Sequence, residues 1–179
     1  QAFWKAVGER VQVIQIADDL GTQHAPFLST DMFRERVMPA YQRGLQWVHE
    51  NTPWKVLLHS DGAIFPLMES LIEMGVDALN PVQTTAVGMD AARLKQAFGA
   101  RIAFWGGACD AQHTLSRGTP AEVAAEVAGN VAVLGAQSGY VCAPVHNVQA
   151  DVPAANVVAL FETALGRERQ AKVALTGDA

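Results

Sequence analysis

The chain has 179 residues, of which 50% are hydrophobic and 17% are charged, and its formal net charge is −5. This composition is sufficient for one folded domain with a hydrophobic core and is unlike that of a disordered chain. The acidic balance argues against nucleic acid or an anionic membrane as a partner, and no apolar run is long enough to span a bilayer.

The cysteines and the first residues suggest a cytoplasmic protein. Cys109 and Cys142 are too few to form a disulfide framework. The opening Gln-Ala-Phe-Trp-Lys lacks the charged and apolar segments of a signal peptide, and it also lacks an initiator Met. We therefore expect a cytoplasmic location and an excised or truncated start.

Strand-like and helix-like segments alternate along the whole chain. The predicted strands are short apolar runs, typical of strands buried on both faces of a parallel sheet, and the predicted helices repeat apolar residues at spacings of three and four. In chain order the predicted elements are strand Val11–Ala17, helix Asp31–Asn51, strand Lys55–Ser60, helix Pro66–Met74, strand Val76–Pro81, helix Asp90–Phe98, strand Arg101–Gly106, helix Pro120–Leu134, strand Tyr140–Pro144 and helix Pro153–Leu165.

Capping residues agree with these helix boundaries. Thr119-Pro120-Ala121-Glu122 predicts a capping box with Pro at the first helical position. Glycines follow four of the predicted helices, at positions 75, 99, 135 and 166.

Repeated strand–helix units predict an α/β fold with a parallel sheet in a single domain, residues 1–179, of which 166–179 are polar enough to fray. The chain contains about five units, whereas a closed (β/α)₈ barrel needs eight units and about 250 residues. Periodicity alone leaves two architectures open, a complete doubly wound domain or part of a barrel.

Polar residues follow all five predicted strands, where parallel α/β folds place their functional sites. Opposite strand ends show no such enrichment, so a site at the carboxyl edge of the sheet is predicted. These residues are Asp18, Asp19, His59, Asp61, Asn80, Gln83, Asp110, Gln112, Cys142, His146 and Asn147.

The segment His59-Ser60-Asp61-Gly62 is the sharpest local feature. Alternation along a strand puts His59 and Asp61 on one face, where they could bind zinc if His146 or Cys142 supplied a third ligand. Alternatively, Asp61 only orients His59 or caps the following helix.

Two further segments allow a chemical and a structural interpretation. Paired carboxylates at Asp18 and Asp19 suit acid–base chemistry, or one of them binds backbone N–H groups while Gly21 takes a positive φ. The Gly106-Gly107 pair before Asp110 allows close backbone approach to a ligand, or forms only a tight turn. No dinucleotide or Walker A motif is present, which weakens the case for a nucleotide fold.

Taken together, these motifs resemble the C-terminal half of the uroporphyrinogen decarboxylase superfamily, which includes decarboxylases and corrinoid-linked methyltransferases. The resemblance covers nearly the whole chain, and the combination of motifs is specific although each one alone is not. The motifs are Asp-Asp-Leu-Gly-Thr-Gln (18–23), Leu-His-Ser-Asp-Gly (58–62), Gly-Val-Asp-Ala-Leu-Asn-Pro-Val-Gln (75–83), Trp-Gly-Gly-Ala-Cys-Asp-Ala-Gln (105–112) and Ala-Pro-Val-His-Asn-Val-Gln-Ala-Asp-Val-Pro-Ala-Ala-Asn (143–156).

The resemblance implies part of a TIM (β/α)₈ barrel that supplies strands four to eight. True decarboxylases carry Gly-His-Gly near the last strand, where this chain has Val145-His146-Asn147. They also place an arginine pair and an essential aspartate in a part of the barrel that this chain does not include. The departure from Gly-His-Gly counts against a porphyrinogen decarboxylase.

The methyltransferase branch binds zinc through His-x-Cys-Gly on the fifth strand and a late Cys. Here the corresponding residues are His59, Asp61 and His146, and the resemblance implies that these three bind the zinc. Without thiolates, activation of a thiol is no longer implied, and such a set could instead bind a carboxylate or an ether oxygen, or hold no metal at all. Within the same comparison we expect catalytic roles for Asp18, Asp19 and Asp110, and substrate binding by Gln23, Asn80, Gln83, Gln112 and Asn147.

The resemblance thus implies a zinc-dependent methyltransferase or demethylase that acts on a small methylated compound with a corrinoid (cobalamin) protein as partner. The alternatives are a decarboxylase of the uroporphyrinogen type, and a non-catalytic barrel fragment that acts only in binding or assembly. Because five units cannot close a barrel, Val11–Ala17 and Tyr140–Pro144 are predicted to be open edges, and a homo-oligomer is expected.

Overall fold

The computed structural model describes residues 1–166, which form one sheet of five parallel strands. The strands follow chain order from edge to edge: β1 (Val13–Ala17), β2 (Lys55–His59), β3 (Ala78–Asn80), β4 (Ala103–Trp105) and β5 (Tyr140–Val141). A doubly wound sheet reverses its strand order, whereas a (β/α) barrel adds each strand beside the previous one. The strand order therefore identifies the chain as part of a (β/α)₈ barrel, as predicted.

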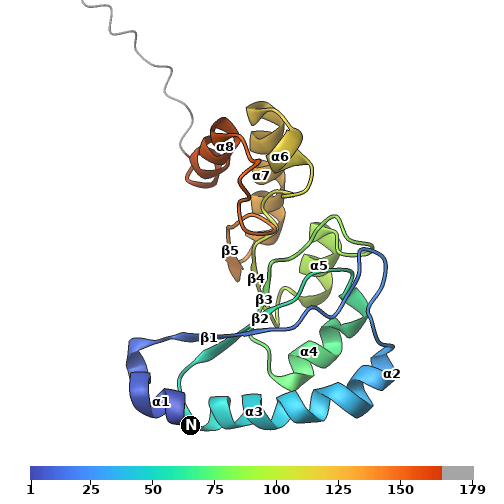
Figure 1. The fold of residues 1–179 in the computed structure, drawn as a ribbon, viewed down its shortest axis with the longest axis vertical. Helices are drawn as coiled ribbons and strands as arrows, with labels where there is room; N and C mark the ends of the chain where they lie inside the picture. Colours follow the sequence, from blue (N-terminus) through green and yellow to red (C-terminus); the bar gives the residue numbers. More distant parts are fainter. Residues whose placement is uncertain (167–179) are drawn as a thin grey trace, which may run out of the picture.

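The helices of the repeating units lie outside the sheet (Figure 1). Figure 1 shows α3, α4 and α5 on one side of the sheet, while α6, α7 and α8 gather at the end next to β5. The helical elements are α1 (Ala2–Val7), η1 (Gly8–Arg10), α2 (Thr30–Met32), the π-helical η2 (Phe33–Val37), α3 (Met38–Asn51), η3 (Phe65–Leu67), α4 (Met68–Met74), α5 (Ala91–Phe98), α6 (Thr114–Arg117), α7 (Pro120–Leu134) and α8 (Ala154–Ala164).

All five predicted strands and all five predicted helices are present; α7 (Pro120–Leu134) has the predicted bounds, and the other elements differ from the prediction at one or both ends. The strands are shorter than the apolar runs, and the predicted helix Asp31–Asn51 is interrupted by the π-helical segment η2. The capping box between Thr119 and Glu122 is confirmed. The predicted fraying tail lies outside the described residues, apart from its first residue.

Two short helices, α1 and α6, were not predicted, because tertiary contacts hold them in place. In α1 the rings of Phe3 and Trp4 pack against Trp54, with centroids 5.6 Å and 5.0 Å away. Helix α6 has only four residues and follows the buried Asp110. Neither helix is long enough to show a clear periodic pattern.

The two faces of the sheet differ in burial. Side chains that point to the helices, such as Val56, Leu79 and Phe104, are fully buried in the main core. The prediction that strands are buried on both faces is wrong for β1, where exposed and half-buried residues alternate, and for β5, where Tyr140 is half-buried and Val141 is exposed. Eight strands together fill the interior of a closed barrel, and this sheet has five. β1 and β5 are its edges, and the homo-oligomer stays a prediction.

Helices α6, α7 and α8 enclose a second, smaller core around Leu115, Val127 and Leu160. Asn156, which is 1% exposed, joins them: its Nδ2 donates to the carbonyl oxygens of Leu115 (3.0 Å) and Gly118 (2.8 Å). A single buried amide thus satisfies two backbone acceptors around α6, including one beyond its C-terminal end.

We expect Asn156→Ala to lower the free energy of unfolding by about 1–3 kcal/mol, because two carbonyl oxygens would lose their donor in a buried site. Urea unfolding followed by circular dichroism measures this. The control is Asn51→Ala on the exposed end of α3; among the described residues, Asn51 Nδ2 donates to the carbonyl oxygen of Trp47 one turn earlier. That variant is expected to stay within about 0.5 kcal/mol of the parent, and equal losses for both would contradict the assignment.

Candidate functional site

The register of the parallel strands lines up the residues at their carboxyl ends. Ala17 pairs with His59, and His59 pairs with Asn80. Residues at the same level of neighbouring strands point to the same face of a sheet. His59 and Asn80 therefore lie side by side on the inner face, at the edge where the predicted site residues gather.

A chain of hydrogen bonds sets the tautomer of His59. The carbonyl oxygen of Trp105 can only accept, so Asn80 Nδ2 donates to it at 2.9 Å. Asn80 Oδ1 then accepts from His59 Nδ1 at 2.6 Å. In the neutral imidazole this leaves the lone pair on Nε2, the form in which histidine binds a metal ion.

His59 belongs to a cluster with two carboxylates that follow β1 and β2. One ligand atom each from Asp19, His59 and Asp61 lie within 4.8 Å of one another. His59 Nε2 is 3.6 Å from Asp61 Oδ2, and the backbone N–H of Asp61 donates to Asp19 Oδ1 at 3.1 Å. The nitrogen and the two carboxylates therefore converge on one point, with two loops contributing.

The electrostatics of this cluster are set by Asp61. Burial raises the pKa of the Asp61 carboxyl, the charge of Asp19 raises it further, and His59 and His146 act in the opposite direction. A carboxylate that is removed from water beside another carboxylate lacks a counter-charge. A cation bound by the cluster would supply that charge.

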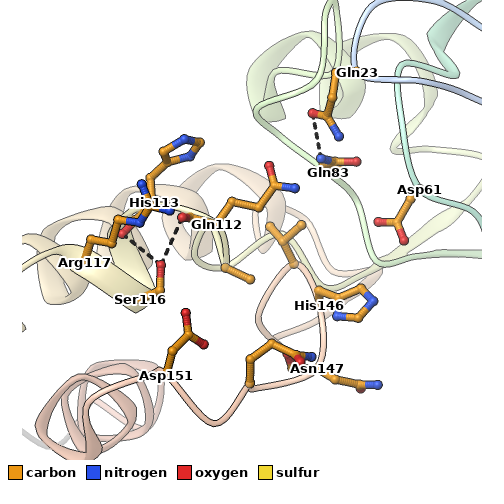
Figure 2. Close-up of a pocket in the computed structure, with 13 residues that line it drawn as sticks. Gln23, Asp61, Gln83, Gln112, His113, Ser116, Arg117, His146, Asn147 and Asp151 are labelled. Carbon is orange, nitrogen blue, oxygen red and sulfur yellow. Dashed lines mark hydrogen bonds between the residues drawn. The ribbon is translucent and has the colours of Figure 1, made fainter.

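His146 lies next to the cluster rather than within it. Its ring is 6.4 Å from that of His59, centroid to centroid, in an edge-to-face arrangement. It borders two clefts. One, of about 780 Å³, is also lined by Asp61, and the other, of about 540 Å³, is also lined by His59. Figure 2 shows His146 and Asp61 on the same side of the larger cleft.

Glycines allow the loops to come this close. Gly62 has a φ of +94°, and a Cβ there would lie 2.4 Å from the carbonyl carbon and oxygen of Gly21. Gly106 has a φ of +119°, and a Cβ there would lie 2.0 Å from the carbonyl oxygen of Pro81. The expectation that Gly21 takes a positive φ is wrong. The positive φ belongs to Gly62, which contacts Gly21 from the neighbouring loop.

Gln83 was predicted to bind substrate, but the structure places it deeper. It is 3% exposed and its Oε1 accepts from the backbone N–H of Gly62 at 2.9 Å. The preceding Val82 has a φ of +62°, a strained conformation for a β-branched residue. No local sequence signal indicated this conformation.

The other predicted catalytic carboxylates lie outside the cluster. Asp18 Oδ2 accepts from the Tyr41 hydroxyl at 2.6 Å, and this bond is the main reason that the pKa of Tyr41 rises to about 12. Asp110 is buried, and its oxygens accept from the backbone N–H groups of Gln112 and His113 and from the His113 ring. The structure thus gives both residues a bonding role within the fold.

The other residues that were predicted to bind substrate line the clefts. Gln23 and Gln112 line the larger one, and Asn147 lines both. Cys142, the alternative third ligand, is not in a metal-ligand group among the described residues. Burial raises the pKa of its thiol, which disfavours the thiolate form that binds metals.

We expect Gly62→Ala to lower the free energy of unfolding by about 2 kcal/mol or more, because both the positive φ and the contact with Gly21 resist a methyl group. The matched control is Gly44→Ala on α3, where a Cβ meets nothing within 4 Å. In that helix the change is expected to stabilise by about 0.5–1 kcal/mol. Thermal unfolding of both variants measures the difference, and a stable Gly62→Ala protein would contradict the proposed loop contact.

No helix in the part of the chain that the structure describes combines the length and the apolar character needed to cross a membrane.

Comparison with known proteins gives a matching family model and solved structures of similar fold. The sequence model of the family described as uroporphyrinogen decarboxylase (URO-D) matches residues 2–166. No curated protein matches the chain. Among solved structures, a methyltransferase from Methanosarcina mazei has a TM-score of 0.67 and 22% sequence identity, covering 87% of this chain and 42% of that one.

The structural likeness shows the fold, and the chain spans less than half the length of that methyltransferase. The family match extends over nearly all of the described residues. The chain therefore belongs to the uroporphyrinogen decarboxylase (URO-D) family, and its parallel strands in chain order agree with a barrel fold.

Proposed function

We propose that this chain forms the metal-binding part of a methyltransferase-like enzyme that demethylates a small methylated compound, with a corrinoid protein as methyl acceptor. The observation that carries the proposal is the convergence of Asp19, His59 Nε2 and Asp61 beside a cleft of about 780 Å³. The methyltransferase named among the fold neighbours supports the reaction class. The corrinoid partner follows from the resemblance of the strand-end motifs.

The donor set fits a divalent metal ion, with zinc as the first candidate. One imidazole and two carboxylates are ordinary zinc ligands, and Asn80 fixes the imidazole as an outer partner does in known zinc sites. The set contains no thiolate, so it suits an oxygen-containing substrate group better than a thiol. When bound, the metal supplies a Lewis acid for the substrate atom that loses the methyl group.

The side chains of this chain have distinct parts in the proposed reaction. Asn80 keeps the lone pair of His59 on Nε2, and Asp19 and Asp61 supply negative oxygens. His146 borders both clefts, where its imidazole can bind the substrate or give a proton to the atom that loses the methyl group.

We expect the chain to bind one zinc ion, and His59→Ala or Asp61→Asn to weaken that binding by about tenfold or more, because each removes a ligand atom. Isothermal titration with zinc, repeated with manganese and magnesium, measures the affinity. The control is Asp151→Asn, which removes a carboxylate from the same cleft but outside the cluster. Its affinity should stay within about threefold of the parent value.

Equal weakening in Asp151→Asn, or no binding by the parent chain, would overturn the metal site. Methyl transfer is then tested with reduced cobalamin as acceptor and a panel of small methyl ethers, followed by the absorbance of the methylated product. Activity that is the same in the parent chain and in Asp61→Asn would contradict the proposed role of the metal.

We also expect Asp61→Asn to stabilise the metal-free protein at neutral pH. Because the pKa of Asp61 is raised in the native state, the native state holds this proton more tightly than the unfolded state does. The native state therefore gains stability as the pH falls through the raised pKa, and ionised Asp61 destabilises it above that pH. Unfolding free energies of parent and variant, compared from pH 4 to pH 8, should diverge as the pH rises. A variant that is less stable at neutral pH would contradict this.

A further inference from the structure

The carboxamide of Gln83 has only one possible orientation. The backbone N–H of Gly62 is buried and can only donate, and Gln83 Oε1 is the partner that the structure gives it, at 2.9 Å. The opposite orientation would turn the NH₂ group of Gln83 towards another donor. The Nε2 of Gln83 must therefore point away from Gly62, as a donor.

The side-chain oxygen of Gln23 accepts the hydrogen bond from Gln83 Nε2. Gln83 Nε2 donates to Gln23 Oε1 at 2.9 Å, and the two side chains are joined in this way in Figure 2. The backbone of Gln23 is also held, because its carbonyl oxygen accepts from the N–H of Val87 at 3.0 Å. With its oxygen engaged, Gln23 is left with the two hydrogens on Nε2, which have no partner among the described residues.

This arrangement sets the polarity of one wall of the larger cleft. Gln23, Gln83 and Asp61 all line it, and Asp61 is the residue before Gly62, where the hydrogen-bond chain begins. The donor on Gln23 and the Asp61 carboxylate of the cluster therefore face the same space from neighbouring loops. Figure 2 shows the side chain of Gln112 extending into this space opposite the pair.

We infer that Gln23 is a specificity-determining residue that donates a hydrogen bond to an acceptor oxygen of the substrate, and that Gln83 is the positioning residue that fixes its direction. The inference rests on the proposed function in taking this cleft as the substrate site. The substrate class is then a small methylated compound with an acceptor oxygen, such as an ether, sulfoxide, amide or carboxylate, rather than a simple thioether or a methylated ammonium ion. A substrate without that oxygen leaves the donor unpaired when it displaces water, which lowers its affinity.

The test uses two probes of similar shape that differ in the acceptor: dimethyl sulfoxide and dimethyl sulfide. Binding to the metal-free chain, kept metal-free with a chelator, is followed by nuclear magnetic resonance from the saturable shifts of amides around the cleft. The parent chain should prefer the sulfoxide by about fivefold, the value of one neutral hydrogen bond. The side-chain amide protons of Gln23 should shift with the sulfoxide and not with the sulfide.

The variants separate binding from positioning. Gln23→Met removes the donor and should abolish the preference for the sulfoxide. Gln83→Met frees the Gln23 amide to turn and should reduce the preference to less than about twofold. The matched control is Gln149→Met, which removes a carboxamide of the same cleft whose Nε2 already donates to the carbonyl oxygen of Asn147. It should keep the full preference.

A preference that survives in Gln83→Met, or that falls equally in Gln149→Met, would overturn the inference. The measurement on the parent chain needs no substitution, so it decides the question even if a variant fails to fold. If the chemical shifts of the Gln23 side-chain amide protons do not change when the sulfoxide is added, the inference is wrong. Failure of the metal site would appear in the zinc titration and would leave the probe preference intact, so the two proposals fail separately.

Discussion

The site depends on the register of the parallel sheet. Pairing of Ala17 with His59 and of His59 with Asn80 puts the carboxyl ends of β1, β2 and β3 at one level, so the loops that follow begin side by side. Asn80 can then reach both the His59 ring and the carbonyl oxygen of Trp105 on the next strand. A slip of one residue would turn His59 towards the helices and separate it from Asn80.

Two hydrogen-bond chains transmit the polarity of a backbone group to the cleft. One starts at a carbonyl oxygen on β4 and ends at His59, where it presents a lone pair; the other starts at the N–H of Gly62 and ends at Gln23, where it presents a donor. In each chain an amide side chain has no freedom to turn, because its first partner is acceptor-only or donor-only. In the proposed site, the metal-binding nitrogen and the substrate-facing donor are thus oriented before any ligand arrives.

The same region carries features that lower the stability of the fold. Val82 has a positive φ, and Gly62 and Gly106 have backbone conformations and close contacts that a residue with a Cβ would not tolerate. The Asp61 carboxyl is partly removed from water. Conformational strain and desolvated charge persist where the surrounding packing enforces them and are frequent at functional sites. Here the enforcing contacts come from the main core beneath β2 and β3.

The sequence by itself determined the five strand–helix units, the capping box of α7, and the gathering of polar residues at one edge of the sheet, because these depend on local periodicity and on the common direction of parallel strands. Periodicity left a barrel and a doubly wound sheet open, and the resemblance of the strand-end motifs implied the barrel. The strand order of the tertiary structure confirms the barrel, since strand order is a long-range property that periodicity does not show. Only the tertiary structure decided which polar residues meet: Asp19 joins His59 and Asp61, Asp18 turns to Tyr41, and Gln83 becomes a buried support. These outcomes depend on contacts between loops that are far apart in the chain. The direction of each side chain there is set by the backbone groups with which it must form hydrogen bonds, and no local sequence pattern indicates which groups these are.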